Sequence, residues 1–381
     1  MDEPFLYDGG EISDEFRKGI TCVRIGPQVT TIASGAFARC HCLTDVQFNE
    51  RLQVVEDYAF EYCTELRSVT IPSTVTELGK RAFMGCRNLT EVRFSEGLRV
   101  IGDYAFASCT ALRSVFLPRT ATHLGRWAFH CCTNLAEVRL NEGLQAIEER
   151  SFASCGALRS LAIPSTVTRL GQHAFAVCSS LTEVFFLGSE RLLNQEFLDH
   201  GHFGGERELL NHAALEEIIR PRENLAFLRC PFVMVKVPVS RALSERIQRL
   251  AHECKLSVEE RIRGLPRLEL MQDGNVVACF PVVRSASEAH FPFGGTSNGF
   301  DVQDTNLETS RSMYQVLQWV AFHELKESST LIELALWKSR IDGARNVSRD
   351  DCRVPIPDPV KHLVMEYCGF AEFLRPTMDD T

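Results

Sequence analysis

Residues 66–86 read LRSVTIPSTVTELGKRAFMGC, and the same pattern of large apolar side chains returns every 23 residues. Each unit carries one phenylalanine and, three residues later, one cysteine, without a register error. The phenylalanines are Phe37, Phe60, Phe83, Phe106, Phe129, Phe152 and Phe175, and the cysteines are Cys40, Cys63, Cys86, Cys109, Cys132, Cys155 and Cys178. A fixed period of this length predicts a solenoid, in which each coil packs on its neighbours.

Within the quoted unit, Val69 and Ile71 alternate with polar residues, and Leu66 precedes them by three positions. Alternation of period two predicts one short, half-buried strand in each repeat. Stacked coils would then form parallel strands about 4.8 Å apart. A later apolar position, Leu78 in this unit, leads to an Ala-Phe pair that we expect in a short helical turn.

A longer period of 46 residues overlies the shorter one. Proline follows the strand in alternate units only, at Pro72, Pro118 and Pro164. Proline ends the ladder of backbone hydrogen bonds, so it turns the chain out of the strand. The exposed surfaces of odd and even coils must therefore differ.

The unit from Leu66 to Cys86 resembles the BspA-type (Treponema pallidum-type) leucine-rich repeat, whose pattern is L-x-x-[VI]-x-[IL]-P-x-x-[VL]-x-x-I-G-x-x-A-F-x-x-C. Residues 112–132 and 158–178 match nearly as well, and the likeness covers about residues 20–190. It implies an α/β repeat fold, an open right-handed coil with parallel strands on one face, and a protein-binding role. Bacterial members are surface proteins, whereas many from protists and algae are intracellular. The stretch 331–342, with 352–354, is similar to tails of repeat proteins from diatoms and related algae.

The period fails after Leu187, and a mixed α+β or helical region is expected beyond it. In this region we predict a strand within 230–239, one or two helices over 241–263, a hairpin over 268–280 that turns at Asp273-Gly274, and helices at 311–327, 331–341 and 358–369. The expected divisions are an N-terminal segment 1–19, repeats 20–187, a degenerate last coil or cap 188–222, an α+β segment 223–283, a flexible Gly/Ser-rich linker 284–310 and a helical segment 311–381.

Composition and charge argue against some classes of ligand and some locations in the cell. The net charge is −9 and neither half of the chain is basic, which argues against nucleic acid or an anionic membrane as the main ligand. The first 16 residues are acidic and lack the apolar core of a secretory signal, and no apolar run is long enough to span a bilayer. We therefore expect a cytoplasmic or nuclear protein.

The sequence contains only incomplete copies of metal-binding motifs. His252-Glu253 and His323-Glu324 begin like the zinc motif H-E-x-x-H, but Leu256 and Glu327 stand where the second histidine is needed. The polar cluster over 199–206 fits a solvated loop better than a metal site. We predict no catalytic residue, no metal and no cofactor. The periodic cysteines are expected as reduced, small core residues, with bridges or a metal between neighbouring coils as the lesser alternatives.

Strand alternation also predicts a binding face. Since Val92 and Phe94 point inward, Glu91 and Arg93 point outward, and the same reasoning applies one coil at a time. Exposed arginine beside exposed phenylalanine is typical of interface hot spots. The predicted partner-binding residues are Glu91, Arg93, Phe116, Glu137, Arg139 and Phe185. The alternative is a solvated face of ion pairs, with Phe185 covered by the C-terminal cap.

Three functions fit this sequence. The leading hypothesis is a non-enzymatic scaffold that binds a protein partner on the outward face of the strands. The second is an exported surface or adhesion protein, as for bacterial relatives. The third is an enzyme whose site lies unrecognised in residues 223–381, which would require a pocket with paired titratable groups.

Overall fold

The computed structural model describes residues 3–200, 209–219, 226–231, 234–290, 296–302 and 307–343. The chain divides into two compact units that interleave in sequence. The first contains Met1–Asn194, Leu210–Pro238 and Ala278–Asn306, and the second contains Gln195–Leu209, Val239–Val277 and Leu307–Thr381.

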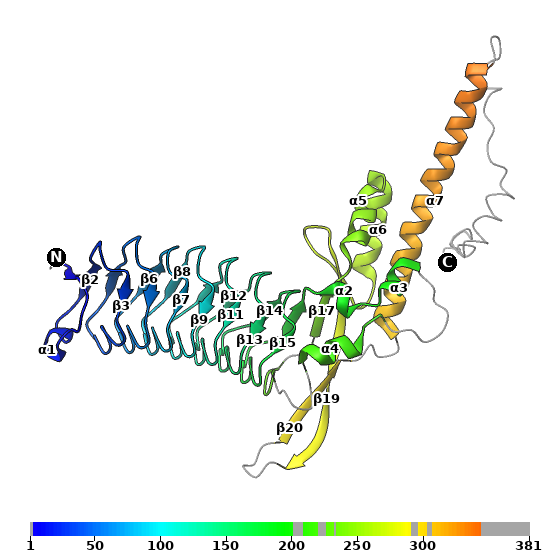
Figure 1. The fold of residues 1–381 in the computed structure, drawn as a ribbon. Coiled ribbons are helices and arrows are strands. Elements are labelled where there is room, and N and C mark those ends of the chain that lie inside the picture. The colour runs from blue at the N-terminus through cyan, green and yellow to red at the C-terminus, as the bar shows by residue number, and fades with distance from the viewer. Residues whose placement is uncertain are drawn as a thin grey trace. The chain divides into compact units, whose positions relative to one another are not determined.

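The first unit is built on a solenoid whose coils each contribute one strand to a parallel column (Figure 1). Partners along this column are 23 residues apart, as in Val69↔Val92 and Val115↔Val138. The strands are β2 (Cys22–Ile25), β4 (Asp45–Gln47), β6 (Ser68–Ile71), β8 (Glu91–Phe94), β10 (Ser114–Phe116), β12 (Glu137–Arg139), β14 (Ser160–Ile163) and β16 (Glu183–Phe186). This arrangement confirms the predicted fold class, a solenoid of parallel strands.

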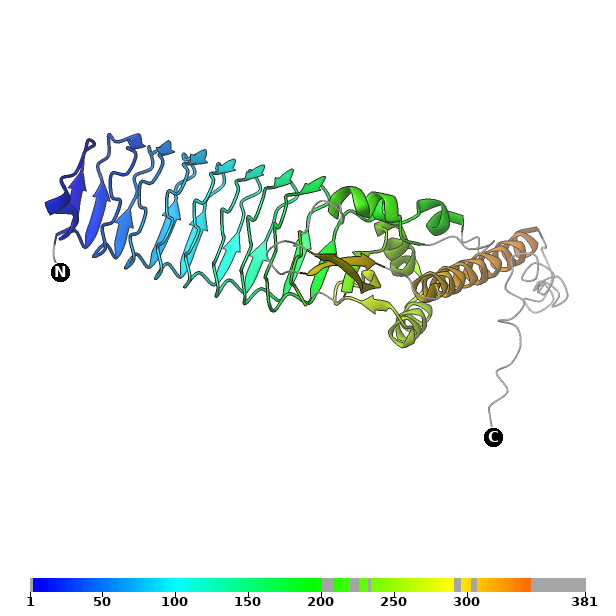
Figure 2. The ribbon, with the colours of Figure 1, turned by 90° about the horizontal axis from the view of Figure 1, so that it is seen from below.

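A second column of strands runs along the solenoid, which the sequence did not predict (Figure 2). Each strand has two residues, one outward and one buried, and two residues are too few to produce a visible alternation. All seven pair in parallel in one sheet. They are β3 (Thr31–Ile32), β5 (Val54–Val55), β7 (Glu77–Leu78), β9 (Val100–Ile101), β11 (His123–Leu124), β13 (Ala146–Ile147) and β15 (Arg169–Leu170).

The periodic phenylalanines form one continuous stack in the core. From Phe37 to Phe175, neighbouring ring centroids lie 5.1–5.3 Å apart and the ring planes differ by 2–8°. All seven side chains are completely buried. Burial of one such side chain contributes roughly 1.5–3 kcal/mol, so the stack accounts for much of the solenoid's stability.

The periodic cysteines have a role beyond filling space. From Cys63 to Cys178, each thiol donates a hydrogen bond of 3.1–3.3 Å to the carbonyl oxygen of the phenylalanine 26 residues earlier. The bond joins consecutive coils and provides a partner for a buried carbonyl group. Throughout the described residues the cysteines are free thiols, as predicted.

The N-terminal segment covers the first coil. Strand β1 (Phe5–Tyr7) pairs in parallel with β2, and helix α1 (Asp14–Arg17) follows it. The ring of Tyr7 packs edge-on against Phe37 at a centroid distance of 4.9 Å. This contact covers the phenylalanine that would otherwise end the stack in solvent.

An eighth coil follows a 29-residue insertion, in the region 188–222 that the sequence prediction interpreted as a degenerate last coil or cap. Phe227 lies 52 residues after Phe175, yet the two rings stack at 5.4 Å. Cys230 donates to the carbonyl oxygen of Phe175 at 2.9 Å, as the earlier cysteines do in their coils. Strand β17 (Met234–Pro238) then pairs in parallel with β16. The repeat therefore continues past residue 222, and the insertion carries helices α2 (Ser189–Leu192) and α4 (His212–Ile219).

The last two strands of the first unit extend into the stretch 284–310, which was expected to be a flexible linker. Strand β19 (Val276–His290) pairs antiparallel with β20 (Thr296–Val302). The Gly/Ser-rich composition indicated a loop, but the backbones of the two strands pair as an antiparallel hairpin. The structure therefore differs from the prediction over much of 284–310.

The second unit is mainly helical. The predicted helices over 241–263 are confirmed as two, and the predicted hairpin has its turn at Gly274, where φ is +81°. The region expected as helices 311–327 and 331–341 is one continuous helix, and the predicted helix 358–369 lies outside the described residues. The elements are α3 (Gln195–His200), α5 (Arg241–Arg249), α6 (His252–Gly264), β18 (Leu268–Leu270) and α7 (Glu308–Gly343).

Candidate partner-binding face

The long strands from β2 to β17 present a surface that we call the strand-lined face: their outward positions, together with the residue just before each strand. Strand β8 shows how the sequence creates it. Val92 is 5% exposed and packs inward, whereas Glu91 and Arg93 on either side are exposed. Alternation along the pleat places these side chains in columns that run the length of the solenoid.

Ion pairs occupy part of this face, within single strands. The guanidinium of Arg93 donates to Glu91 at 2.6 Å, and that of Arg139 donates to Glu137 at 2.7 Å. The hydrogen bond that Arg93 donates to Glu91 raises the pKa of Arg93. Residues two apart on one strand face the same way, so these ion pairs form within a strand. Because these groups are largely exposed, solvent screens each pair and the pair adds little to stability.

Phe116 is the large apolar side chain at the centre of this face. It is 45% exposed, although Val115 beside it is fully buried. In the register of the sheet Phe116 lies opposite Arg139, whose guanidinium carbon sits 4.9 Å from the ring centroid. The pair leaves an accessible aromatic edge next to a cation, which is the composition of an interface hot spot.

Phe185 has a different environment, because the eighth coil partly covers it. In the sheet it lies opposite Lys236 of β17, whose ammonium nitrogen is 5.3 Å from the ring centroid. The same ammonium group is buried and donates to Glu183 at 3.0 Å. The six predicted residues thus share one face, but Phe116 is accessible and Phe185 is only half exposed.

Sequence reasoning missed two sets of residues on this face. Lys236 belongs to the eighth coil, whose signal is the sequence Ala-Phe-Leu-Arg-Cys at 226–230, a copy of the A-F-x-x-C motif out of register. The second set consists of arginines just before alternate long strands. They are Arg67, Arg113 and Arg159, which are exposed and recur every 46 residues.

Large side chains at the turns after the short strands form a column of their own along the solenoid. Its members adopt positive φ, from 53° to 60°, and their side chains stack on one another. Arg81 lies between the rings of Tyr58 and Tyr104 at 5.6 and 5.3 Å, and Arg150 lies 4.5 Å from the Trp127 ring. These half-buried groups pack face to face, and the cation–π contacts stabilise the turns.

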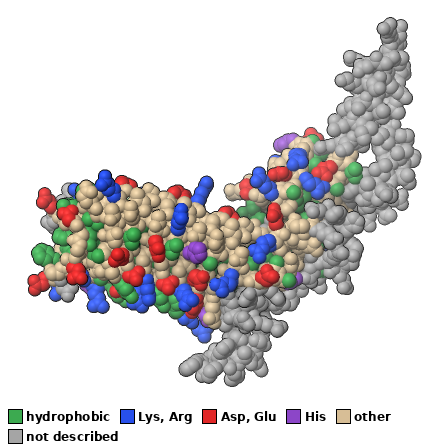
Figure 3. Space-filling model, in the orientation of Figure 1, with side chains coloured by type: hydrophobic (Ala, Val, Ile, Leu, Met, Phe, Trp, Pro, Cys, Tyr) green, Lys and Arg blue, Asp and Glu red, His purple; other side chains and the backbone are tan. Residues whose placement is uncertain are grey.

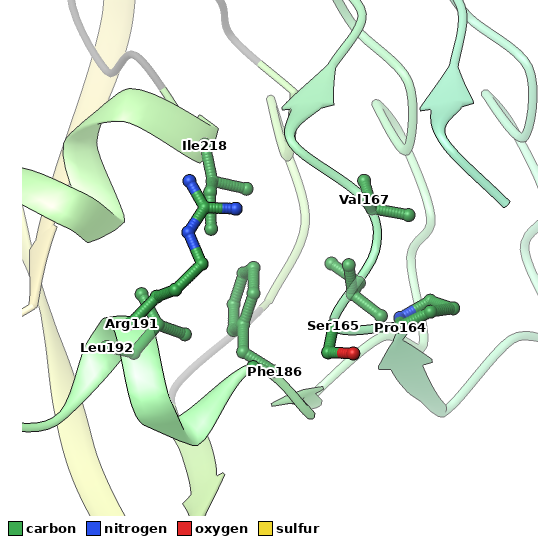
Figure 4. A pocket seen from close by; sticks show the side chains of 9 residues that line it. Pro164, Ser165, Val167, Phe186, Arg191, Leu192 and Ile218 are labelled. Carbon is green, nitrogen blue, oxygen red and sulfur yellow. The ribbon is translucent and has the colours of Figure 1, made fainter. Parts of the chain in front are cut away.

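A small cavity lies where the insertion meets the last regular coils (Figure 4). Phe186 of β16 and Val167 line one side, and Leu192 of α2 and Ile218 of α4 line the other. Arg191 lies over it and forms a weak pair with Glu217 at 3.9 Å. The space accommodates about one water molecule, so it is a packing gap rather than a ligand pocket.

Neither of the incomplete zinc motifs gains ligands from the fold. In the part of the chain that the structure describes, no group of three or more His, Cys, Asp or Glu side chains is placed to hold a metal ion. Most of the polar cluster 199–206 lies outside the described residues.

Among the described helices, none is both long and apolar enough to cross a membrane. On the side of the solenoid seen in Figure 3, acidic and basic side chains alternate along the coils.

The fold and this face define a leucine-rich repeat solenoid. A family model for the BspA type leucine rich repeat region matches residues 16–135 and 99–200, with six copies. Residues 16–200 therefore belong to the BspA-type leucine-rich repeats, as the resemblance in the sequence indicated. Among curated proteins, no sequence matches this chain significantly.

Solved structures include proteins with the same kind of repeat. A leucine-rich repeat protein from T. pallidum is 29% identical, with 42% of this chain and 77% of that chain covered and a TM-score of 0.39. A leucine-rich cell surface protein from Faecalibacterium prausnitzii is 22% identical, with 59% and 62% covered and a TM-score of 0.33. The pneumococcal vaccine antigen PcpA is 18% identical, with 48% and 65% covered and a TM-score of 0.29.

Proposed function

We propose that this chain is a non-enzymatic scaffold that binds a protein partner on the strand-lined face. Glu91, Arg93, Phe116, Glu137, Arg139 and Phe185 are the proposed contact residues. The observation that carries the proposal is the exposure of Phe116 at 45%, in the middle of a face whose other large aromatic side chain, Phe185, is partly covered. A phenylalanine in water at this position is unfavourable unless a partner covers it.

The neighbours of Phe116 support the same interpretation. Ser114, two residues earlier on the same strand, is small and leaves the ring accessible, while Arg139 provides a charged group that can bind a partner's carboxylate after desolvation. The ion pair between Arg139 and Glu137 is exposed, so a partner can replace it at little cost. The face thus combines an apolar anchor with exchangeable polar contacts.

Replacement of the anchor provides the test. We expect Phe116→Ala and Arg139→Ala each to lower the free energy of unfolding by less than about 1 kcal/mol, because both side chains are exposed. Each should also reduce by about tenfold the amount of specific partner retained from an extract of the native organism, since hot-spot truncation costs about 1–2 kcal/mol. Retention would be quantified by mass spectrometry on the immobilised full chain.

The matched control is Val54→Ala, which removes an apolar side chain that is 38% exposed on the short strands. It should leave both stability and partner retention unchanged. If Phe116→Ala instead destabilised the fold by several kcal/mol, its ring would be buried by another segment. The face would then be an internal docking surface, and the proposal would fail.

We further propose that the scaffold works in the cytoplasm or nucleus. The support is the chemistry of its thiols: Cys42 is exposed and Cys22 and Cys131 are half-buried, all as free thiols. Oxidising compartments pair or modify such groups. We expect fractionation of the native cells to place the protein with soluble intracellular markers. Recovery from the cell surface or the medium would instead favour the adhesion alternative.

A further inference from the structure

The arginines at 46-residue intervals give the strand-lined face a repeating charge. We call Arg67, Arg113 and Arg159 the arginine row. Each lies immediately before a long strand, and its backbone carbonyl accepts a hydrogen bond from the next coil. In the intervening coils the same position holds Thr44, Thr90, Ala136 and Thr182. The row therefore contains one cation for every two coils and no opposing charge.

The charges around the row do not neutralise it. The carboxylates of Glu91, Glu137 and Glu183 are each engaged by a cation on the same face, at 2.6–3.0 Å. Within the described part of the chain, no ion pair involves a member of the arginine row.

The strand-lined face is therefore positive, although the chain carries a net charge of −9. Its acidic residues are Asp45, Glu91, Glu137 and Glu183. Its basic residues are Arg24, Arg67, Arg93, Arg113, Arg139, Arg159 and Lys236. The excess of three positive charges equals the number of arginines in the row, so charge complementarity favours an acidic partner segment.

The spacing of the row restricts the shape of that segment. Parallel strands are about 4.8 Å apart, so arginines two coils apart are separated by about 9.6 Å. A polyproline II helix has three residues per turn and rises about 9.3 Å per turn, so every third side chain returns to the same side. In an α-helix the matching interval is seven residues, or about 10.5 Å. In a β-strand, side chains on one side are about 6.8 Å apart, which does not match.

We propose that the arginine row binds an acidic segment in the polyproline II conformation, with a carboxylate at every third residue. Each carboxylate would accept hydrogen bonds from one of Arg67, Arg113 and Arg159. Residues between the carboxylates, proline in the simplest case, would pack on the exposed ring of Phe116, three residues along the chain from Arg113. This inference rests on the proposed function and specifies the chemistry of its partner.

Binding of defined peptides to the full chain tests the proposal. The probe is a fluorescein-labelled 18-residue peptide with glutamate at every third position and proline elsewhere. It is compared by fluorescence anisotropy with a peptide of the same composition whose glutamates are contiguous, and with a helical peptide that has glutamate at every seventh position. We expect the period-three peptide to bind at least about tenfold more tightly than either, because its carboxylate spacing of about 9.3 Å is nearer to the row's spacing of about 9.6 Å than the helical spacing of about 10.5 Å.

Substitutions in the row provide the second part of the test. Arg67→Gln, Arg113→Gln and Arg159→Gln together should weaken binding of the period-three peptide by about tenfold, since each exposed ion pair contributes only a few-fold. The matched control replaces Arg99, Arg126 and Arg169 by Gln, which removes the same charge from exposed positions near the short strands. It should leave the dissociation constant unchanged within about twofold.

Three outcomes would overturn the inference: equal binding of all acidic peptides, tighter binding of the helical peptide, or equal losses for the two triple variants. Equal binding would identify a general polyanion site, and preference for the helix would identify a different kind of partner. If the peptides show no preference but Phe116→Ala still abolishes partner retention, the proposed function stands and only the partner chemistry is wrong. If neither effect is seen, both fail.

Discussion

Replacement of Phe106 by alanine is expected to lower the free energy of unfolding by about 3–5 kcal/mol. Its ring is completely buried and lies between those of Phe83 and Phe129, 5.3 Å from each. Phe94 also packs edge-on against it at 5.7 Å. Truncation would leave a cavity that neighbouring coils cannot fill, because the hydrogen bonds between coils fix their spacing. This loss is a large fraction of the stability of a typical domain.

Urea unfolding followed by circular dichroism would measure this effect. Phe116→Ala removes the same atoms from an exposed position, so it provides the control and should change stability by less than about 1 kcal/mol. Phe227→Ala extends the test, because a loss close to that of Phe106→Ala is expected if the eighth coil belongs to the cooperative core. A loss below about 1 kcal/mol at Phe106 would contradict the continuous stack.

The sequence predicted the solenoid because its core positions recur without an insertion from Phe37 to Phe175. Each phenylalanine, cysteine and strand residue keeps the same environment in every coil, so a local pattern determines a long-range structure. The burial of Val69 and Ile71 and the exposure of Ser68 and Thr70 follow from strand alternation alone. Over this part of the chain, the fold follows from the repeat without a separate prediction of contacts between residues distant in sequence.

The eighth coil was not predicted, because 29 inserted residues separate Phe227 from its expected position. The motif Ala-Phe-Leu-Arg-Cys was present, but a fixed period does not find a copy that is out of register. For residues 276–302, the local composition was misleading. Their Gly and Ser content indicated a loop, although the hydrogen bonds of an antiparallel pair override such weak local preferences.

The candidate site was predicted in outline. Alternation placed Glu91, Arg93 and Phe116 on one surface, and the structure has them there. Strand alternation did not identify the arginine row. Arg113 lies just before its strand, where alternation no longer applies. The contact between Lys236 and Phe185 joins residues 51 positions apart across the insertion, which local patterns do not reveal.

Alkaline pH is expected to destabilise the solenoid steeply, through its column of buried thiols. Burial raises the pKa of Cys63, Cys86, Cys109 and Cys132 well above the ordinary value of 9.0, and that of Cys40 to about 11. Below pH 9 both the folded and unfolded chains keep these thiols protonated, so stability is unaffected. Above pH 9 the unfolded chain loses the protons while the folded chain retains them, so ionisation favours unfolding.

The size of this effect follows from the number of thiols. Each one that ionises only in the unfolded chain lowers the free energy of unfolding by about 1.4 kcal/mol per pH unit. Because an unfolded thiol is half ionised at pH 9, the four thiols at Cys63, Cys86, Cys109 and Cys132 together would lower it by about 4 kcal/mol between pH 9 and pH 10, a large fraction of the whole stability of a small domain. Urea unfolding at a series of pH values from 7 to 10 would measure the slope.

Serine substitutions separate the thiols from other groups that titrate at high pH. In the double variant Cys109→Ser and Cys132→Ser, the hydroxyl groups can still donate to the carbonyls of Phe83 and Phe106 but do not ionise. The slope above pH 9 should therefore be smaller by about 2.7 kcal/mol per pH unit. Cys42→Ser, at an exposed position, should leave the slope unchanged. An unaltered slope in the double variant would show that these thiols ionise equally in both states, and hence that water reaches the core of the coils.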